Sequence, residues 1–432
     1  MALLLVVVIA GCRASSPPAA EVLPSPSLDQ RKALALALPS DAPELTRAAA
    51  SVREAPELAD RWVVLGQRWV RQARLSNDPG QYLSAEAAAD VALSIQPEHS
   101  GATALLALVA LNQHRFTQSK ALAQKALAVR EDDFLALAAL ADATLELGQL
   151  SESREAVQRM IDLKPSLPAY GRAAHLRALQ GDVRGAQALY RQAIDSGRNP
   201  KDPEPQAWMI VQSALLFLDA GDVDGAEAGF ALALSKLPAF PPALVGQARV
   251  ALARGQASQA VTLLEQSITA SPLVESIALL AEAHSLAGDA AGAEAAWARA
   301  ELLGRQSDGL ALGRAWAEAN LHAQDAVKLL ERENGERPNP FVKGALAWAL
   351  FRSGRCEEAR TVSAESVSSG LSDSRLRYQR AAVLAECGSR DDARQELEAV
   401  MTRELALSPR QRSEASALLR RLNAHAQRGT AE

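Results

Sequence analysis

Cysteine and histidine are the residue types in this 432-residue sequence that are best suited to metal binding or covalent chemistry. A zinc site needs Cys and His ligands at short spacings, and a helical metalloprotease site needs two His four residues apart around a Glu. The six histidines match neither pattern: they stand at His99, His114, His175, His284, His322 and His425. The sequence also lacks the Gly-x-Ser-x-Gly turn and the glycine loops that hold phosphates. We therefore expect no metal, no cofactor and no catalysis, so the chain is not predicted to be an enzyme.

Cys12 is different, because it directly follows the apolar run ALLLVVVIAG at residues 2–11. That run is too short to span a bilayer, but it suits the hydrophobic part of a secretion signal. Residues 9–12 (IAGC) resemble the lipobox of bacterial lipoproteins. The resemblance implies that residues 1–11 are a signal peptide and that Cys12 is lipidated after cleavage, which anchors the protein stably in a membrane. Arg13 at the next position then favours the outer membrane, with the protein facing the periplasm.

The start of the chain leaves an alternative open. No lysine or arginine precedes the apolar run, although secretion signals usually carry one there. The true start would then lie elsewhere, and the protein would be a soluble cytoplasmic one. Residues 12–31 are rich in proline and serine and show no apolar periodicity, which is typical of a flexible tether.

A repeat of mostly small residues runs through most of the chain. Ten positions follow one another at spacings of 33 or 34 residues, with one spacing of 40: Ala92, Ala126, Met160, Ala193, Ala233, Ser267, Ala300, Glu333, Ser366 and Val400. Within a copy, two apolar helical patterns flank a turn that is usually marked by a glycine, such as Gly148, Gly181 or Gly221. We find no sustained alternation of the kind that marks a strand. Since a period of this length indicates stacked helix pairs, we predict an all-α solenoid.

The repeat resembles the tetratricopeptide repeat, a helix–turn–helix unit of about 34 residues. Trp62, Leu65, Gly66 and Trp69 match the W-x2-L-G-x2-Y opening of that repeat. Residues 338–360 are similar to the last-but-one unit of bacterial envelope tetratricopeptide proteins. The resemblance implies a right-handed α-solenoid of about ten units, built from antiparallel helices.

This resemblance sets the expected organisation of the chain. The array should occupy residues 59–402, between N-terminal capping helices at 32–58 and a C-terminal capping helix at 403–425. The eighth unit departs from the repeat, with Arg314 in place of alanine and Leu321 in place of the turn glycine. Because each unit of a solenoid packs on its neighbours alone, we expect a curved rod in which distant units do not touch. Such a rod has no pocket for a small-molecule substrate.

The binding surface is also implied by the resemblance. In tetratricopeptide arrays the first helices of the units line a concave groove, and the matching positions here are Asp142, His175, Trp208, Val211, Leu215, Arg249, Glu282, Phe341, Trp348, Phe351, Arg352, Arg375 and Tyr378. The Lys and Asn pattern of the family's carboxylate clamp is absent. The natural partner of such a groove is an extended peptide or an amphipathic helix of another protein. Alternatively, Trp348 and Phe351 only pack between helices.

The two remaining cysteines acquire a meaning from the expected stacking. Cys356 follows the turn of the ninth unit, and Cys387 ends the first helix of the tenth. Neighbouring helices of successive units run antiparallel, so the two residues should lie near one edge of the array. In an oxidising periplasm they could form a disulfide. The alternative is two buried thiols that act as small apolar side chains.

Composition narrows the class of partner. The net charge is −5 and both signs are interspersed, so no basic stripe for nucleic acid is present. We therefore predict a lipid-anchored scaffold of the bacterial cell envelope that binds protein or peptide partners and assembles envelope complexes. Two alternatives remain: a soluble cytoplasmic adaptor, and a regulatory subunit of an enzyme that is carried on another chain.

Overall fold

The structure, a computed structural model, describes residues 26–40, 42–76, 78–199 and 202–429. Cys12, the apolar run and most of the expected tether lie outside the described residues. Every regular element in the described ranges is helical, and no strand occurs there. None of these helices is long and apolar enough to cross a membrane.

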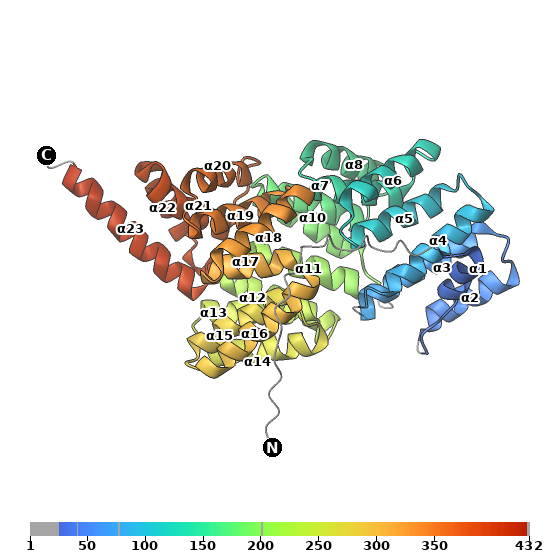
Figure 1. The fold of residues 1–432 in the computed structure, drawn as a ribbon, viewed down its shortest axis with the longest axis horizontal. Coiled ribbons are helices and arrows are strands. Elements are labelled where there is room, and N and C mark those ends of the chain that lie inside the picture. The colour runs from blue at the N-terminus through green and yellow to red at the C-terminus, as the bar shows by residue number, and fades with distance from the viewer. Residues whose placement is uncertain (1–25, 41, 77, 200–201, 430–432) are drawn as a thin grey trace, which may run out of the picture.

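The helices are arranged as two capping helices, ten pairs and a terminal helix. Two helices precede the pairs, α1 (Leu28–Ala35) and α2 (Pro43–Glu54). The ten pairs of the described chain, which we number as units one to ten, are α3 (Ala59–Ser76) with α4 (Gln81–Ile95), α5 (Ser100–Asn112) with α6 (Phe116–Val129), α7 (Phe134–Glu146) with α8 (Leu150–Leu163), α9 (Leu167–Leu179) with α10 (Val183–Ser196), α11 (Glu204–Asp219) with α12 (Val223–Lys236), α13 (Pro241–Ala253) with α14 (Ala257–Ala270), α15 (Val274–Leu286) with α16 (Ala290–Ser307), α17 (Gly309–Ala319) with α18 (Ala323–Glu336), α19 (Pro340–Arg352) with α20 (Cys356–Ser366), and α21 (Ser374–Cys387) with α22 (Arg390–Met401). A short 3-10 helix, η1 (Glu404–Ala406), and the long helix α23 (Pro409–Gly429) follow. Figure 1 shows α1 to α4 at one end of the molecule and α23 at the opposite end.

Small residues allow these helices to pack closely. Ala92 and Ala126 are fully buried at the crossings where the repeat pattern places them. A Cβ atom on Gly66 of α3 would lie 2.3 Å from the Leu105 side chain of α5. Trp62 is also buried, and its indole N–H donates to the carbonyl oxygen of Pro56 (2.8 Å), as expected of a packing residue. The repeat therefore has a steric cause, because larger side chains at these crossings would push the helices apart.

In most units the turn between the two helices contains a residue with positive φ. Gly148, Gly181 and Gly221 have φ values of +72°, +78° and +80°. In the eighth unit the turn residue is Asn320, with φ +59°, and not Leu321 as the sequence pattern suggested. Asparagine can replace the turn glycine here because its short polar side chain tolerates the left-handed region of backbone conformation.

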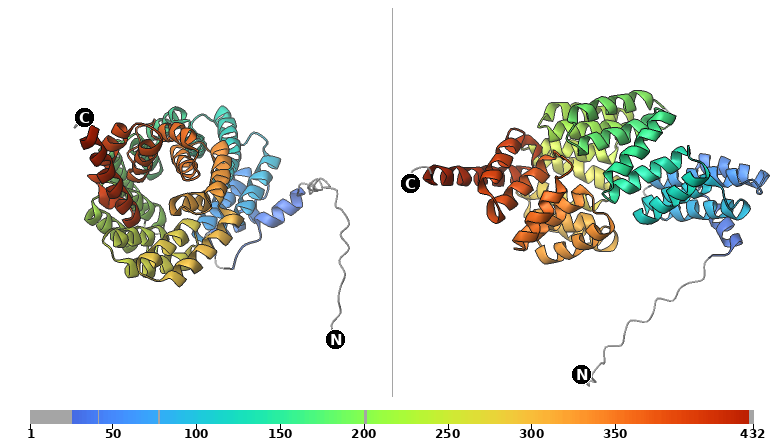
Figure 2. Two further views of the ribbon diagram at one scale, coloured as in Figure 1. Left: turned by 60° about the vertical axis from the view of Figure 1, so that its left-hand side comes forward. Right: turned by 90° about the horizontal axis from the view of Figure 1, so that it is seen from above.

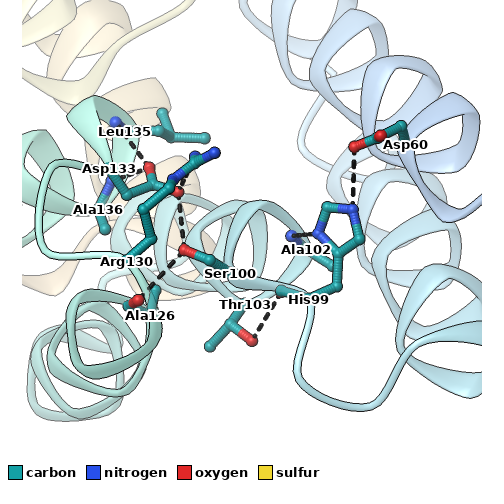
Figure 3. A network of polar contacts seen from close by, with 10 residues as sticks. All are labelled: Asp60, His99, Ser100, Ala102, Thr103, Ala126, Arg130, Asp133, Leu135 and Ala136. Carbon is teal, nitrogen blue, oxygen red and sulfur yellow. Dashed lines mark hydrogen bonds and ion pairs between the residues drawn. The ribbon is translucent and has the colours of Figure 1, made fainter.

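Polar side chains join successive units at the starts of their first helices, as Figure 3 shows for the first three units. The Ser100 hydroxyl donates to the Ala126 carbonyl (3.1 Å) and to Asp133 Oδ2 (2.9 Å), and Asp133 caps α7. The ring of His99 caps α5 through Nδ1, while its Nε2 lies 3.0 Å from Asp60 Oδ1 of the first unit. These contacts fix the angle at which each unit follows the previous one.

The first capping helix begins earlier than the sequence analysis suggested. Residue 32 was the expected boundary, but α1 starts at Leu28. The side chains of Ser27 and Gln30 each accept a hydrogen bond from the backbone N–H of the other, so the helix is capped four residues upstream. The cap is tied to the array by the Trp69 indole N–H, which donates to the carbonyl oxygen of Ala35 (2.8 Å).

The array coils tightly enough for units that are far apart in sequence to touch. The Asn339 side chain donates to Glu146 Oε2 across 193 residues (2.7 Å), and the Ser369 hydroxyl donates to the Leu179 carbonyl across 190 residues (3.1 Å). Figure 2 shows the helices running around a common axis. The expectation of a rod without distant contacts was wrong, because the small rotation between successive units adds up to a full turn after five to six of them.

We call the line of contact between successive turns of the coil the seam. It joins the ends of α7, α9 and α11 to the starts of α19 and α21, so each contact pairs the turn of an early unit with the entry to a late one. At α11, Asp219 Oδ1 accepts a hydrogen bond from the backbone N–H of Ser374 (2.7 Å), and the Ser374 hydroxyl donates to the Asp219 carbonyl (3.0 Å). Leu179, Leu371 and Leu376 form a small buried apolar cluster beside these bonds.

Turn glycines at the seam have a second role beyond their positive φ. A Cβ atom on Gly181 would lie 2.6 Å from the carbonyl oxygen of Gly370 on the next turn, and one on Gly148 would lie 2.8 Å from the Pro338 carbonyl oxygen. A Cβ atom on Gly288, which is away from the seam, would meet nothing within 4 Å. The seam therefore depends on backbone that approaches backbone with no side chain between.

Substitution of these glycines separates the two roles. Gly288→Ala should lower the free energy of unfolding by about 1–2 kcal/mol, because alanine is strained at positive φ. Gly181→Ala has nearly the same φ and adds the clash across the seam, so it should cost roughly 1–3 kcal/mol more. Urea denaturation measures both, and X-ray scattering should show a larger radius for Gly181→Ala alone. Equal losses and equal radii in the two variants would show that the turns do not touch in solution.

Candidate functional site

The closed coil surrounds a cavity of about 760 Å³ that is partly open to solvent. Its wall is built from the first helices of successive units, α9 to α17, and from α19 and α21 of the next turn. Residues 405–411, between η1 and the first turn of α23, complete it. We call this the central cavity. The expectation that the chain has no pocket was wrong, because that expectation assumed an open rod.

Six of the predicted groove residues line the central cavity. They come from six different helices and are His175, Leu215, Arg249, Glu282, Phe341 and Arg375. Asp142 instead forms an ion pair with Arg172 on the neighbouring α9.

Other predicted groove residues lie elsewhere. Val211 is 2% exposed and belongs to the apolar core around α11 and α12. Trp208 is 42% exposed and does not line the cavity. Both are on α11, one and two turns before Leu215, so they lie outside the second half of this helix, which is the part that lines the cavity.

The aromatic residues of the last units form a packed cluster. The rings of Trp348 and Phe351 stack with their centroids 5.3 Å apart, and Arg352 lies 4.4 Å over the Trp348 ring. Tyr378 packs against the same indole and donates a hydrogen bond to Glu414 of α23 (2.8 Å). The C-terminal helix therefore covers this part of the groove, and the arrangement favours the packing alternative for Trp348.

Most charges in the central cavity are paired. Arg314 forms an ion pair with Glu275 and lies 3.9 Å from Glu318 Oε1, which Arg375 contacts at 2.7 Å. The Arg314 guanidinium is the main cause that holds the pKa of Glu275 below its usual value, against the opposing effect of burial. These ion pairs thus link α15 to α17 and α17 to α21.

Arg249 and Glu282 are the exceptions. Among the described residues, Arg249 has no hydrogen bond or ion pair, although burial lowers its pKa and the nearby Glu275 only partly offsets that effect. Glu282 Oε1 is buried without a hydrogen-bond partner within the part of the chain that the structure describes. Burial raises the pKa of Glu282, while the Ser408 hydroxyl lowers it. An arginine stays protonated in proteins, so the Arg249 charge is balanced only through space, by the nearby Glu275 and Glu282 carboxylates.

The histidine and a seam carboxylate complete the electrostatics of the wall. Burial lowers the pKa of His175, so this imidazole is neutral at neutral pH. Burial, with a smaller contribution from the Asp373 carboxylate, raises the pKa of Asp219 to about 6. Asp219 therefore takes up its proton at mildly acidic pH, at the point where the seam meets the cavity.

The segment between the array and α23 is fastened by arginines that donate to backbone carbonyls. Arg403 Nη1 donates to the Ser372 carbonyl (3.2 Å), and Arg412 Nη2 donates to the Ala253 carbonyl at the end of α13 (3.2 Å). Cations are favoured at helix C-termini because the last carbonyls carry partial negative charge. These bonds hold residues 405–411 against the cavity.

Sequence reasoning missed Glu275, Glu318 and Arg314 as cavity residues. Arg314 carried a usable signal, because a long cation stood where the repeat expects alanine. Such a departure indicates a space into which the side chain can extend. The role of residues 405–411 had no sequence signal, since it depends on closure of the coil. No group of His, Cys, Asp and Glu in the described ranges could hold a metal ion.

The two late cysteines lie at the edge of units nine and ten. Cys356 begins α20 and Cys387 ends α21, and the structure joins them in a disulfide with Cα atoms 5.4 Å apart. This Cα separation is within the range of native bridges. The bridge clamps the second helix of the ninth unit to the first helix of the tenth.

Comparison with known proteins identifies the fold. No family model matches the chain, and no curated protein matches it. A structure of the human IFIT1 dimer with m7Gppp-AAAA is similar over 76% of each chain, at 15% identity and a TM-score of 0.52. A tetratricopeptide repeat protein from Parabacteroides merdae matches 56% of this chain and 94% of its own, at 16% identity and a TM-score of 0.42. PilW, a type IV pilus biogenesis factor, matches 49% of this chain and 96% of its own, at 19% identity and a TM-score of 0.41.

These likenesses concern architecture. Together with the ten stacked helix pairs and their glycine turns, the likeness to the IFIT1 structure confirms the predicted fold, an all-α solenoid of tetratricopeptide type. At 15% identity the IFIT1 structure shows the fold alone.

The disulfide can be tested directly. In oxidised protein that is denatured without reductant, neither Cys356 nor Cys387 should react with an alkylating reagent. Cys387→Ser should lower the free energy of unfolding by about 2–4 kcal/mol, since the bridge closes a loop of 31 residues. Reductant should destabilise the wild-type chain to the level of the variant and leave the variant unchanged. Full alkylation of both thiols without reductant would favour the alternative of two separate buried cysteines.

Proposed function

We propose that this chain is a lipid-anchored scaffold of the bacterial envelope that binds a segment of a partner protein inside its coil. One observation carries the binding part: groove residues from six helices converge on a single cavity, where Arg249 forms no hydrogen bond or ion pair and Glu282 Oε1 accepts no hydrogen bond within the described chain. Helical solenoids bind partners on their inner surfaces. A cavity of about 760 Å³ has the size of a ligand site, so it suits the end or loop of a chain and not a folded domain.

The residues on the wall do not favour catalysis. His175 is the histidine that lines the cavity, and no serine or cysteine of the described ranges is hydrogen-bonded to it. A nucleophile with an adjacent base is therefore missing there. Arg314 and Arg375 pair with Glu275 and Glu318, so these charged groups hold one another in place and do not form a nucleophile with its base.

Nucleic acid is a poor fit for the same wall. The IFIT1 structure contains a capped RNA, and its superhelical fold is similar to this one. The cavity here is lined by the four cations Arg249, Arg314, Arg375 and Arg410 and by the five carboxylates Asp219, Glu275, Glu282, Glu318 and Asp373. Binding of a polyanion depends on an excess of cations, which this wall lacks.

The anchoring part of the proposal rests on the sequence around Cys12. The lipobox resemblance would put acyl chains on Cys12, and residues 13–27 would separate the lipid from the start of α1. An extended segment of that length reaches about 45 Å at ~3.1 Å per residue. The scaffold would then stand off the outer membrane and face the periplasm. A soluble cytoplasmic adaptor and a regulatory subunit are the alternatives that the experiments below separate.

Site-specific photo-crosslinking tests the binding part. A photoreactive residue at Leu215, on the cavity wall, should crosslink one partner protein in intact cells that express the full chain. Leu232 is the matched control, because it is a leucine of the neighbouring α12 that is exposed and does not line the cavity. Mass spectrometry identifies the adduct and the crosslinked peptide. Equal labelling from both positions, or none from Leu215, would contradict binding inside the coil.

Membrane fractionation tests the anchor. Cys12→Ala should leave the precursor uncleaved and unlipidated, and globomycin, which blocks the cleavage step, should leave the unaltered chain uncleaved. Ser15→Ala, in the adjoining segment, is the control and should be processed normally. If Cys12→Ala fractionates and migrates like the wild type, the chain is not anchored at this residue and the soluble adaptor becomes the better description.

A further inference from the structure

We infer that the seam is a pH-sensitive closure, which tightens in mildly acidic solution and loosens as the pH rises, through protonation of the Asp219 carboxyl. The inference goes beyond the proposed function, because it concerns the coil itself and holds whatever the cavity binds. It is carried by the placement of two carboxyl groups, from different turns of the coil, at the start of one helix. Both of these residues, Asp219 and Asp373, line the central cavity, so the state of the seam decides the shape of the cavity wall.

The start of α21 is capped twice. Asp373 precedes the helix on its own turn of the coil, and its Oδ1 atom accepts a hydrogen bond from the backbone N–H of Leu376 (2.8 Å). Asp219, the last residue of α11, reaches across the seam, and its Oδ1 atom accepts from the backbone N–H of Ser374 (2.7 Å). The first N–H groups of a helix have no partner within that helix. The bond to Asp219 is therefore the one that protects the Ser374 N–H within the described chain.

Ionised Asp219 is poorly accommodated at this position. It stands at the C-terminal end of α11, where the last carbonyls carry partial negative charge, and the Asp373 carboxylate repels it. Arg403 attracts it, but Arg403 Nη1 donates to the Ser372 carbonyl (3.2 Å) and this guanidinium forms no ion pair among the described residues. A proton on Asp219 removes the repulsion and keeps the bond to Ser374, because one oxygen of a protonated carboxyl still accepts a hydrogen bond.

The direction of the pH dependence follows from the titration of Asp219. Burial and, second to it, the Asp373 carboxylate raise the pKa of Asp219 from its ordinary value of 3.8 to about 6. In an opened coil the carboxyl faces water and returns to the ordinary value, so the closed seam binds the proton more tightly than the open one. The stabilisation of the closed state is complete below pH 3.8 and is lost as the pH rises through about 6. From about pH 5 to about pH 8 the equilibrium constant for closure should fall about tenfold.

The elements packed against α11 carry other titratable groups. They are His175 of α9, Asp182 and Tyr190 of the α10 segment, Asp222 before α12, Arg249 of α13, Glu404 of η1, and Arg375 and Arg377 of α21.

The histidines of the coil have an effect of the opposite sign. Burial lowers the pKa of His175 on the cavity wall. Burial, and then the Arg337 cation of the eighth unit, lower the pKa of His114 in the second unit. A histidine whose pKa is lowered makes the closed coil less stable in acid, so neither histidine can cause the seam to tighten there.

Hydrogen exchange at the Ser374 amide measures the seam directly. The Leu376 amide is the internal reference, because Asp373 of the same turn holds it. Exchange of the purified full chain is followed from about pH 5 to about pH 8 by mass spectrometry with residue-level fragmentation, and each rate is divided by the intrinsic rate of that amide at the same pH. Protection of Ser374 should fall about tenfold over this range, while protection of Leu376 stays constant.

Variants assign the effect to the two carboxyl groups. Asp219→Asn keeps an acceptor oxygen for Ser374 but does not titrate, so protection of Ser374 should become independent of pH. Asp373→Asn keeps a good helix cap and removes the repulsion, so the midpoint of the fall should move to lower pH. Asp289→Asn is the matched control, because Asp289 caps α16 beside a turn that meets no other part of the coil. The control should keep the full tenfold fall.

The opposite results would overturn the inference. They are equal protection of Ser374 at both ends of the pH range, protection that rises with pH, a fall that persists in Asp219→Asn, and a midpoint that does not move in Asp373→Asn. Absence of Ser374 protection at every pH in the wild type would show that the seam is open in solution and would overturn it as well. None of these results bears on whether Leu215 crosslinks a partner, so the proposed function is tested separately.

Discussion

The interior of this protein depends on the approach of two stretches of bare backbone. At Gly181 and Gly370, and again at Gly148 and Pro338, successive turns of the coil come so close that a single methyl group would not fit. Without that approach α19 and α21 would not face α9 and α11, and the first helices would line an open groove. The hydrogen bonds along the seam contribute about 0.5–1.5 kcal/mol each, so closure needs several of them at once. Backbone is suited to these contacts between turns of the coil, because its shape is the same at every unit.

The sequence predicted what is decided locally. Helix pairs and most turn positions follow from a period of 33–34 residues and from turn glycines, most of which have positive φ. Closure of the coil could not be predicted, because it results from small rotations added over five to six units. The seam residues, such as Asn339 and Ser374, also belong to no repeating pattern. For the same reason, only some of the predicted groove residues line the cavity. Arg249 and Glu282 do, whereas Trp348 lies under α23.

The charged residues of the cavity include side chains that are held in ion pairs and one arginine, Arg249, that is not. Glu275 and Glu318 hold Arg314 and Arg375 in place from neighbouring helices. Removal of one partner of either pair would leave a buried charge unpaired and would destabilise the fold. Arg249 stands beside this network and interacts with Glu275 through space, but it forms no hydrogen bond or ion pair among the described residues. The C-terminal segment joins the same region, since Arg412 donates to the last carbonyl of α13 and Arg403 to the loop before α21, while residues 405–411 close the wall. A terminal cap, which in an open solenoid only shields the last unit, therefore takes part in the site.

The register between turns also limits how such a chain can evolve. Repeat arrays ordinarily change length by unequal recombination, which duplicates or deletes one copy at little structural cost. Here Gly148 meets Pro338 and Gly181 meets Gly370 at nearly the same distance along the chain, so an internal duplication would set each early turn against the wrong late one. Only additions outside the overlapping turns would leave the pairing intact. The copy number between units three and ten is thus as much a part of the design as any side chain.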